Sequence, residues 1–410
     1  MRIVIAGETY YPGSNGQAAF TIRLAEGLAA AGHHVMAIVP SERLATYTQE
    51  INGVLVQKLA GMNWTRFHPE MFVTLPHLGI GQILDRFQPD VIHIQDHYII
   101  SHLVVWAARR RRLPSLGTNH FLPDNLYPYI QFLPIPLSVK RYVLWKLMLD
   151  LYNLLDAATA PTETAAQILR GQPIHIPVTA ISNGIDTHVF FPDPTVDRAA
   201  MRRKYGLDPE RALFLYIGRI DGEKRLEVLL RAVQKARRDD FQLAIAGRGA
   251  HLPYLRNMAS HLNLGNQVVF TGYIPAEDKP ALINSADIFA MPSKAELQSI
   301  ATLEAMASAK PVLAANARAL PELVKHRENG YLFNADDVED ATRGMQQLLD
   351  DRAGWEAMGQ ASLARVQLHS LDNTIRLYSE LYRSLIEARA SEDIKIRRKT
   401  SKKKDRAIDL

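Results

Sequence analysis

Two cations in the second half of the chain have the type and spacing needed to hold an anionic ligand. The apolar run Leu213 to Ile217 is followed by Gly218-Arg219, and Lys224 comes five residues after Arg219. If that run is a strand, both cations lie in the loop at its carboxyl end. Fixed positive charge there can neutralise a diphosphate leaving group. The alternative is a solvated charged turn.

Two carboxylates lie further along the same half. Glu296 and Glu304 flank seven residues after a second apolar run, which ends at Met291. Eight helical residues rise about 12 Å and turn about 80° away from the starting face, so these carboxylates cannot act as one close pair. They can instead touch two ends of one long ligand, such as a nucleotide diphosphate sugar. Two glutamates on a surface helix are common, so a structural role stays open.

The elements that must position these residues follow a regular alternation. Short apolar runs alternate with helical patterns, which predicts doubly wound parallel sheets. In the first half the expected strands are residues 3–6, 35–39, 91–94, 115–118 and 178–181. In the second half they are residues 213–217, 242–246, 268–271, 288–291 and 311–314. Ligands of such sheets bind at the carboxyl ends of the strands, so we expect two Rossmann-like domains that face a central cleft.

Length and composition agree with two domains. The 410 residues are 47% hydrophobic and 22% charged, enough to bury two cores. We expect a first domain at 1–195, a second at 196–370 and a helix at 371–390 that packs back on the first. Eight of the thirteen residues from Ile394 to Arg406 are Lys or Arg. Residues 391–410 are therefore predicted to be a disordered basic tail, either solubilising or attracted to an anionic surface.

Several classes of protein are excluded or disfavoured. The chain has no cysteine, which excludes disulfides and thiolate metal sites. We find no apolar window of about 18 residues, and the first apolar run is too short for a signal peptide, so we expect a cytoplasmic protein. A nucleic-acid-binding protein would explain the tail, but a basic face with interleaved aromatics is missing.

The first domain offers two candidate residues of its own. Gly16 closes a glycine-containing loop before the first helix, where backbone amides and a helix N-terminus can face a ligand. Glycines there also serve turns alone. His120 follows the run that ends at Thr118, and by itself it is equally well a satisfied structural histidine.

The order of the motifs resembles the family-4 glycosyltransferases of GT-B fold over nearly the whole chain. The motifs are Glu8 to Pro12 with Gly16, Gly32-His33, Pro89 to His93, Thr118 to His120, Asn183 to Asp186 with Phe190, Gly218-Arg219 with Glu223-Lys224, Ala286-Asp287 before Pro292-Ser293, and Glu296 to Glu304 followed by Ala305 to Ala307. Two short stretches depart from the pattern. Leu297-Gln298-Ser299 replaces the usual Gly-Phe-Gly, and Gly247-Arg248-Gly249 replaces Gly-Asp-Gly.

The resemblance implies roles for matching residues. Arg219 and Lys224 are expected to hold the donor diphosphate and Glu304 the ribose hydroxyls, while Glu296 and His120 are expected beside the transferred sugar. The four residues implied in catalysis are His120, Arg219, Lys224 and Glu296. The residues implied in donor binding are Gly16, Gly218, Arg219, Lys224, Glu296, Ser299, Ile300 and Glu304.

The resemblance also implies a hexosyl transfer with retention, from a UDP-hexose or GDP-hexose. We expect no cofactor and no metal, because no Asp-x-Asp motif ends a strand and two cations already supply positive charge. An epimerase of the same fold fits the Arg219 and Glu304 motifs less well.

The acceptor is expected to be a membrane lipid such as diacylglycerol or a glycolipid. The apolar and aromatic segment 121–137 follows His120, and the segment around Trp145 and the basic tail add a surface suited to an anionic bilayer. We therefore expect peripheral binding to the inner face of the cell membrane. Two alternatives stay open: a soluble sugar or sugar phosphate acceptor, and a helix of residues 144–155 whose leucines are ordinary core.

Overall fold

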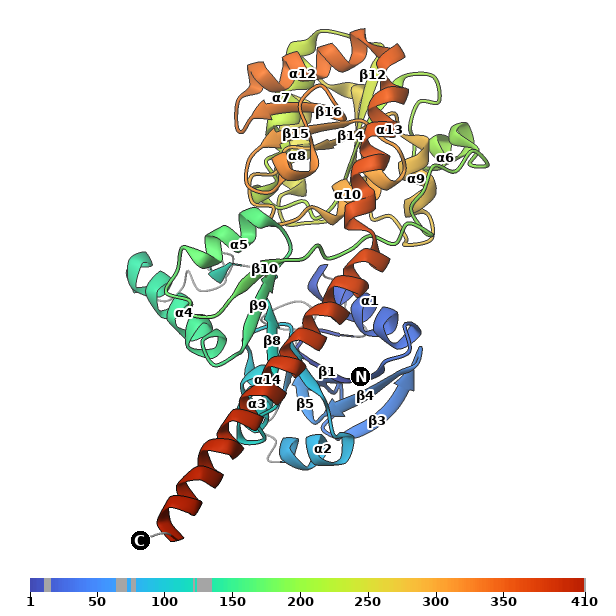
Figure 1. Cartoon of the computed structure of the whole chain (residues 1–410). Coiled ribbons are helices and arrows are strands. Elements are labelled where there is room, and N and C mark those ends of the chain that lie inside the picture. Colours follow the sequence, from blue (N-terminus) through green and yellow to red (C-terminus); the bar gives the residue numbers. More distant parts are fainter. Residues whose placement is uncertain (11–15, 64–71, 75–78, 121, 124–134, 409–410) are drawn as a thin grey trace. The chain divides into compact units, whose positions relative to one another are not determined.

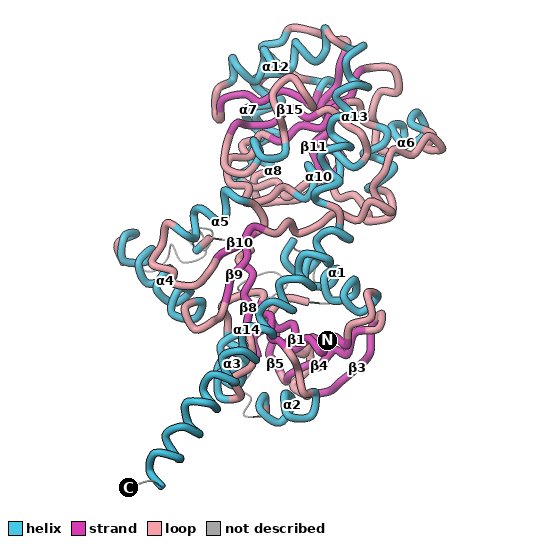
Figure 2. Tube along the Cα trace, in the orientation of Figure 1, coloured by secondary structure: helices cyan, strands magenta, loops and turns pink. Residues whose placement is uncertain are grey.

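The computed structural model describes residues 1–10, 16–63, 72–74, 79–120, 122–123 and 135–408, with residues 62–63, 72–73 and 396–408 described by their backbone only (Figure 1). The chain forms two compact units. The first unit comprises Met1–Ser182 and Thr374–Leu410, and the second comprises Asn183–Asn373. In each unit the strands are flanked by helices (Figure 2).

The first unit is built on an eight-stranded sheet of order β10-β9-β8-β7-β1-β2-β4-β3. All neighbours are parallel except β3 and β4. The strands are β1 (Arg2–Ala6), β2 (His34–Pro40), β3 (Tyr47–Ile51), β4 (Val54–Leu59), β7 (Val91–Ile94), β8 (Ser115–Thr118), β9 (Ala157–Ala160) and β10 (Val178–Ala180). A separate antiparallel pair consists of β5 (Gly61–Asn63) and β6 (Phe72–Thr74). The five strands predicted for this half are therefore present.

The helices of the first unit follow its strands. They are α1 (Gly16–Ala30), α2 (Ile80–Phe87), α3 (Ile99–Arg110), α4 (Leu137–Tyr152) and α5 (Glu163–Arg170). Helix α1 ends at Ala30, two residues before Gly32. Gly32 has a φ of +86°, a left-handed conformation that glycine adopts without the steric cost of a Cβ.

The last helix, α14 (Leu371–Ile408), packs on the first unit through a buried polar network. Tyr382 Oη lies 2.7 Å from His93 Nδ1, and His93 Nε2 lies 2.6 Å from Thr118 Oγ1. Tyr378 Oη lies 3.1 Å from the hydroxyls of both Thr118 and Thr159. Both tyrosines are fully buried in the core that includes Ile3. The network satisfies polar groups that would be costly to bury alone.

The basic C-terminal segment differs from the expectation of disorder, because α14 continues through it to Ile408. Residues 391–408 contain neither glycine nor proline, and Lys and Arg are good helix formers, so nothing local ends the helix. Ion pairs join Arg389 to Asp156 and Arg112 to Asp393, the latter at 2.8 Å. The sequence interpretation weighed charge and overlooked the missing helix breaker.

The second unit is built on a six-stranded parallel sheet of order β13-β12-β11-β14-β15-β16. The strands are β11 (Ala212–Ile217), β12 (Phe241–Ala246), β13 (Val268–Gly272), β14 (Ile288–Met291), β15 (Val312–Asn316) and β16 (Gly330–Asn334). The helices are α6 (Arg198–Lys204), α7 (Leu226–Ala236), α8 (Leu252–His261), α9 (Lys279–Ser285), α10 (Ile300–Ala307), α11 (Leu320–Leu323), α12 (Val338–Asp350) and α13 (Trp355–Val366). Its five predicted strands are present, and β16 was missed.

The boundary between the units lies at Ser182, upstream of the predicted residue 195. The stretch 191–194, just before the predicted boundary, is bonded to the second unit. Asn284 Nδ2 donates to Phe191 O at 3.0 Å, and Asp193 N donates to Asn284 Oδ1 at 3.1 Å. These tertiary hydrogen bonds decide the unit to which the stretch belongs.

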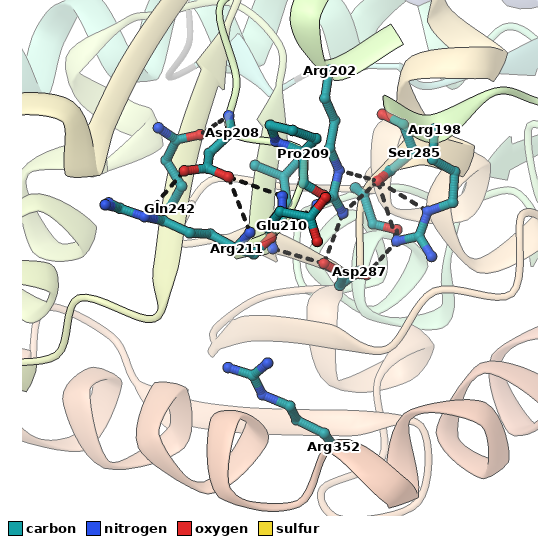
Figure 3. Close-up of polar contacts among 12 residues, drawn as sticks. Arg198, Arg202, Asp208, Pro209, Glu210, Arg211, Gln242, Ser285, Asp287 and Arg352 are labelled. Atoms are coloured by element: carbon teal, nitrogen blue, oxygen red, sulfur yellow. Dashed lines mark hydrogen bonds and ion pairs between the residues drawn. The ribbon is translucent and has the colours of Figure 1, made fainter. Parts of the chain in front are cut away.

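Asp287, a residue of one of the family motifs, has a structural role in the second unit (Figure 3). Its carboxylate accepts hydrogen bonds from Arg202 and from the backbone amide of Leu213, both at 2.8 Å, and it pairs with Arg198. Arg202 also donates to Ser285 O at 2.8 and 2.9 Å. These contacts fasten α6 to the start of β11 and to the turn before β14.

Candidate active site

The loop after β11 carries Arg219 on its surface. The guanidinium is 64% exposed and lies 2.5 Å from Asp221 Oδ2 and 3.0 Å from Glu223 Oε1. Exposed ion pairs of this kind contribute about 0–1 kcal/mol, so Arg219 can leave them at little cost. The side chain is therefore accessible from solvent, and its role towards an anionic ligand stays a prediction.

Lys224 is more enclosed and pairs with Glu296. It ends a short 3-10 turn (Gly222–Lys224), and its Nζ lies 2.6 Å from Glu296 Oε1. The side chains are 15% and 11% exposed. Glu223 lies beside both predicted cations, because its Oε1 is 3.8 Å from Lys224 Nζ as well as 3.0 Å from Arg219. The fold thus brings Arg219, Lys224 and Glu296 into one charged cluster.

Gly218 is required where β11 enters this cluster. A Cβ atom at Gly218 would come within 2.9 Å of Tyr216 Oη, which donates to Arg219 O at 2.6 Å. Burial, followed by the nearby Glu296 carboxylate, raises the pKa of Tyr216 well above its usual range, so this hydroxyl keeps its proton. The tyrosine thereby fixes the backbone from which the Arg219 side chain extends.

The backbone conformation and close packing at Gly247 require glycine at the first position of the altered motif Gly247-Arg248-Gly249. Its φ is +141°, and a Cβ there would come within 1.9 Å of Gly218 O. The loop after β12 therefore lies directly against the loop that carries Arg219. Arg248 is exposed, and its guanidinium lies 4.9 Å from the centre of the Tyr273 ring.

The segment between the two glutamates corrects the sequence prediction of one continuous helix. Helix α10 begins only at Ile300, so Glu296 lies in a loop and the helical rise of about 12 Å does not apply between the two residues. The physical reason is the N-cap at Ser299, whose Oγ accepts from Thr302 N at 3.4 Å and from Thr302 Oγ1 at 2.9 Å. The buried Ser299 side chain serves this cap.

Glu304 lies on α10 with its side chain only 3% exposed. Its Oε2 is 2.5 Å from Nζ of Lys279, the first residue of α9. Lys279 was not predicted from the sequence. A single lysine before a proline has no motif that marks it, and the contact exists only because α9 and α10 pack together.

In the first unit, Gly16 is the first residue of α1. A Cβ there would have no described atom within 4 Å, so packing of the described residues does not require glycine. The next residue, Gln17, donates through Nε2 to Gln95 O at 3.0 Å and more weakly to Asp96 Oδ2 at 3.4 Å. Residues 11–15 lie outside the described residues.

His120 lies just after β8, in contact with a side chain that follows β7 and with one from α1. Its Nε2 is 2.9 Å from Gln95 Oε1, and its ring centre is 4.8 Å from that of Phe20. Burial lowers the pKa of His120 to about 3, so the imidazole is neutral near pH 7. A neutral ring can hydrogen bond to a sugar hydroxyl but carries no charge.

A buried acidic pair near His120 was also missed by the sequence analysis. Glu8 N donates to Asp96 Oδ2 at 2.5 Å, and Glu8 Oε1 accepts from Ile100 N at 2.9 Å. Burial, and then the Asp96 charge, raise the pKa of Glu8 to about 8. The signal that was available is the position of both acids just after apolar strands.

The described part of the chain lacks two kinds of feature. It holds no group of three or more His, Cys, Asp or Glu side chains arranged to hold a metal ion. None of its helices combines the length and hydrophobicity needed to cross a membrane.

Two family models match consecutive parts of the chain. Residues 14–189 match "Glycosyltransferase Family 4", and residues 197–365 match "Glycosyl transferases group 1". With the two parallel-sheet units and the charged cluster after β11, these matches define the protein as a glycosyltransferase. The chain belongs to the family-4 glycosyltransferases of GT-B fold.

Three relatives show the range of the family. Sulfoquinovosyl transferase SQD2 of Arabidopsis thaliana is 28% identical, and the match covers 73% of this chain but only 58% of that protein. A GDP-mannose-dependent alpha-mannosyltransferase of Corynebacterium glutamicum is 24% identical over 87% of this chain and 84% of that protein. Alpha-monoglucosyldiacylglycerol synthase of Streptococcus pneumoniae is 25% identical, and the match covers 81% of this chain and 75% of that protein.

A solved structure supports the fold. Anabaena HepE, in complex with UDP-glucose, superposes with a TM-score of 0.72 at 17% sequence identity. The match covers 94% of this chain and all of that one. At this identity the likeness establishes the GT-B architecture.

Proposed function

We propose that this glycosyltransferase moves a hexose from a nucleotide diphosphate sugar to a hydroxyl of a membrane lipid, with retention of anomeric configuration. The single observation that carries the donor assignment is the cluster at the carboxyl end of β11, where exposed Arg219 and enclosed Lys224 lie beside the Glu296 carboxylate. Two cations there suit a leaving diphosphate.

The proposed chemistry uses these charges in place of a metal. The acceptor oxygen bonds to the anomeric carbon on the face that the diphosphate oxygen leaves, and the acceptor proton passes to the leaving phosphate. Arg219 and Lys224 stabilise the negative charge that develops on the diphosphate. Lys224 must then exchange part of its contact with Glu296 for the phosphate oxygens, which leaves Glu296 free to bind hydroxyls of the hexose.

The remaining site residues contact the ribose and the transferred sugar of the donor. Glu304 accepts hydrogen bonds from the ribose, and neutral His120 contacts the transferred sugar. Gly16, at the start of α1, lets the backbone approach the donor, and Ser299 and Ile300 contribute contacts at the start of α10. The donor base is a choice between uracil and guanine, since relatives and neighbours are named with both.

The lipid acceptor is supported by an exposed apolar face on α4. The side chains of Leu137, Val139, Tyr142, Val143 and Leu147 are exposed there. Such a face, next to exposed Arg141, suits the interfacial region of an anionic bilayer. One relative is named as a glucosyldiacylglycerol synthase, which agrees with this acceptor class.

Two parts of the sequence prediction change here. Trp145 is buried together with Met148 and Leu149, so it packs in the core and does not contact lipid. Leu147 is exposed, so the alternative in which every leucine of this helix is core is wrong. Most of the predicted acceptor segment, residues 121 and 124–134, lies outside the described residues.

The test combines release of nucleotide with vesicle binding. Hydrolysis of UDP-glucose and GDP-mannose is measured with and without diacylglycerol, and we expect the lipid to stimulate release from one donor. Product analysis by NMR then reports the anomeric configuration, and an inverted or epimerised product contradicts the proposal.

Membrane contact is tested with Tyr142→Ser and Leu147→Ser combined in one variant. This protein should sediment less with anionic vesicles, while Tyr254→Ser, an exposed tyrosine of the second unit, serves as the matched control. Equal recovery of all proteins in the supernatant, with transfer to a soluble sugar, would establish the soluble acceptor instead.

A further inference from the structure

The carboxylate of Glu304 is enclosed in the second unit and needs a nearby positive charge. Its side chain is 3% exposed, and Oε2 is buried without a hydrogen bond from any described residue. An ionised carboxylate in that setting is costly unless a cation compensates it. Among the described residues the compensating cation is Lys279, with Nζ 2.5 Å from Oε2.

Lys279 is held in place from two sides. It occupies the first position of α9, and its Nζ also lies 5.7 Å from the ring centre of the buried Phe190, within the range of a cation–π contact. The lysine is only 26% exposed. Its contact with Oε2 is short but lacks hydrogen-bond geometry, so it acts on Glu304 mainly through charge.

The two glutamates of the proposed donor site are therefore each paired with a lysine from another element. Glu296 pairs with Lys224 at 2.6 Å, and Glu304 pairs with Lys279 at 2.5 Å. In the proposed chemistry Lys224 is required by the diphosphate. Glu304 binds neutral hydroxyls instead, so its lysine has no reason to leave when the donor binds.

We propose that Lys279 is a positioning residue for the nucleoside end of the donor, acting through Glu304. Its positive charge lies 2.5 Å from the enclosed carboxylate and orients it, so that Glu304 presents a strong acceptor to the ribose hydroxyls. This inference rests on the proposed function and deepens it by assigning a residue that no motif marks. Without Lys279, the carboxylate loses the cation that orients it, and nucleoside binding weakens.

The test is a double-mutant cycle read by calorimetry. Binding of UDP and GDP, and of the corresponding monophosphates, is measured for the wild type, Lys279→Met, Glu304→Gln and the double variant. Lys279→Met should weaken binding about 10-fold, equally for monophosphate and diphosphate, because a charge-assisted hydrogen bond to the ribose is lost. In the Glu304→Gln background the same change should have almost no effect.

The controls separate positioning from other roles. Lys279→Arg keeps the charge and should restore most of the affinity, whereas Lys294→Met removes an exposed lysine of the same unit, paired with Asp336, and should change nothing. Lys279→Gln provides a second neutral variant if Lys279→Met fails to fold, and thermal unfolding checks each protein.

The contrary outcomes are distinct. A larger loss for diphosphate than for monophosphate, or a loss that persists with Glu304→Gln, means that Lys279 contacts phosphate directly and overturns the inference. Unchanged or tighter binding by Lys279→Met overturns it as well. If the wild type binds neither UDP nor GDP, the proposed function fails first and this inference fails with it.

Discussion

Replacement of Lys224 tests whether the charged cluster after β11 performs catalysis or only stabilises the fold. Lys224→Met removes the cation 2.6 Å from Glu296 and leaves that carboxylate unpaired at 11% exposure. Removal of one partner from a buried ion pair lowers the free energy of unfolding by about 3–5 kcal/mol. An exposed ion pair contributes only about 0–1 kcal/mol. This pair is mostly enclosed, so we expect a loss of stability of about 2 kcal/mol.

This loss of stability should appear as a lower Tm, and a second substitution at Glu296 should restore most of it. For a unit of this size, about 2 kcal/mol lowers Tm by about 4–8 °C. Lys224→Met combined with Glu296→Gln removes both charges and should recover most of that shift. Turnover should fall by about 10²-fold or more in both variants, because the cation that stabilises the leaving diphosphate is missing in each.

The assay is donor turnover at saturating donor, measured beside differential scanning calorimetry of the same samples. Lys294→Met, which removes an exposed lysine paired with Asp336, controls for loss of one positive charge on this unit. Near-wild-type turnover by a folded Lys224→Met protein would refute the catalytic assignment. Recovery of turnover together with Tm in the double variant would show that the lysine serves only the fold.

Further predictions concern the metal, the buried acids, the ribose contact and the basic segment. Full activity should survive excess EDTA, and a loss that magnesium restores would contradict metal independence. Burial raises the pKa of Glu8 from its ordinary value of 4.5 to about 8, so unfolding between these pH values releases a proton and stability falls as pH rises. In calorimetry, Glu8→Gln should remove this dependence of stability on pH. An identical pH dependence in the wild type and the variant would show that Glu8 is not its source. Glu304→Gln should weaken nucleotide diphosphate binding by at least about 10-fold in calorimetry, and equal affinity would remove its assignment. Truncation from Ile394 onward should reduce sedimentation with anionic vesicles at about 50 mM salt but not at about 500 mM, while donor hydrolysis is retained. Unchanged sedimentation at the lower salt concentration would show that this segment does not contribute to membrane binding.

The sequence was sufficient for the architecture because buried parallel strands form continuous apolar runs. Val91–Ile94, Ser115–Thr118 and Ile288–Met291 are strands with the predicted bounds. The short β9 was missed, since its Ala-Ala-Thr-Ala sequence has little hydrophobic contrast. Strand β3 was missed because its Tyr-Thr-Gln-Glu-Ile sequence is largely polar and pairs on one side only, at the sheet edge.

The positions of Arg219 and Lys224 were also predictable from sequence, since both follow directly from the end of β11. The start of α10 was not predicted, although Ser299 is a good N-cap, because the whole segment from Glu296 to Glu304 was interpreted as one helix. The cap has a local signal in the sequence, and weighing it would have placed Glu296 in a loop.

The sequence by itself determined the chemical types available and the strand ends at which they lie. Tertiary structure alone decided which charges meet: Lys224 with Glu296 across 72 residues, and Lys279 with Glu304 between two helices. It also decided that Tyr378 and Tyr382 close a polar network around His93. The physical reason is that strand formation depends on local hydrophobicity, whereas the pairing of buried charges depends on which distant elements exclude water from the same place.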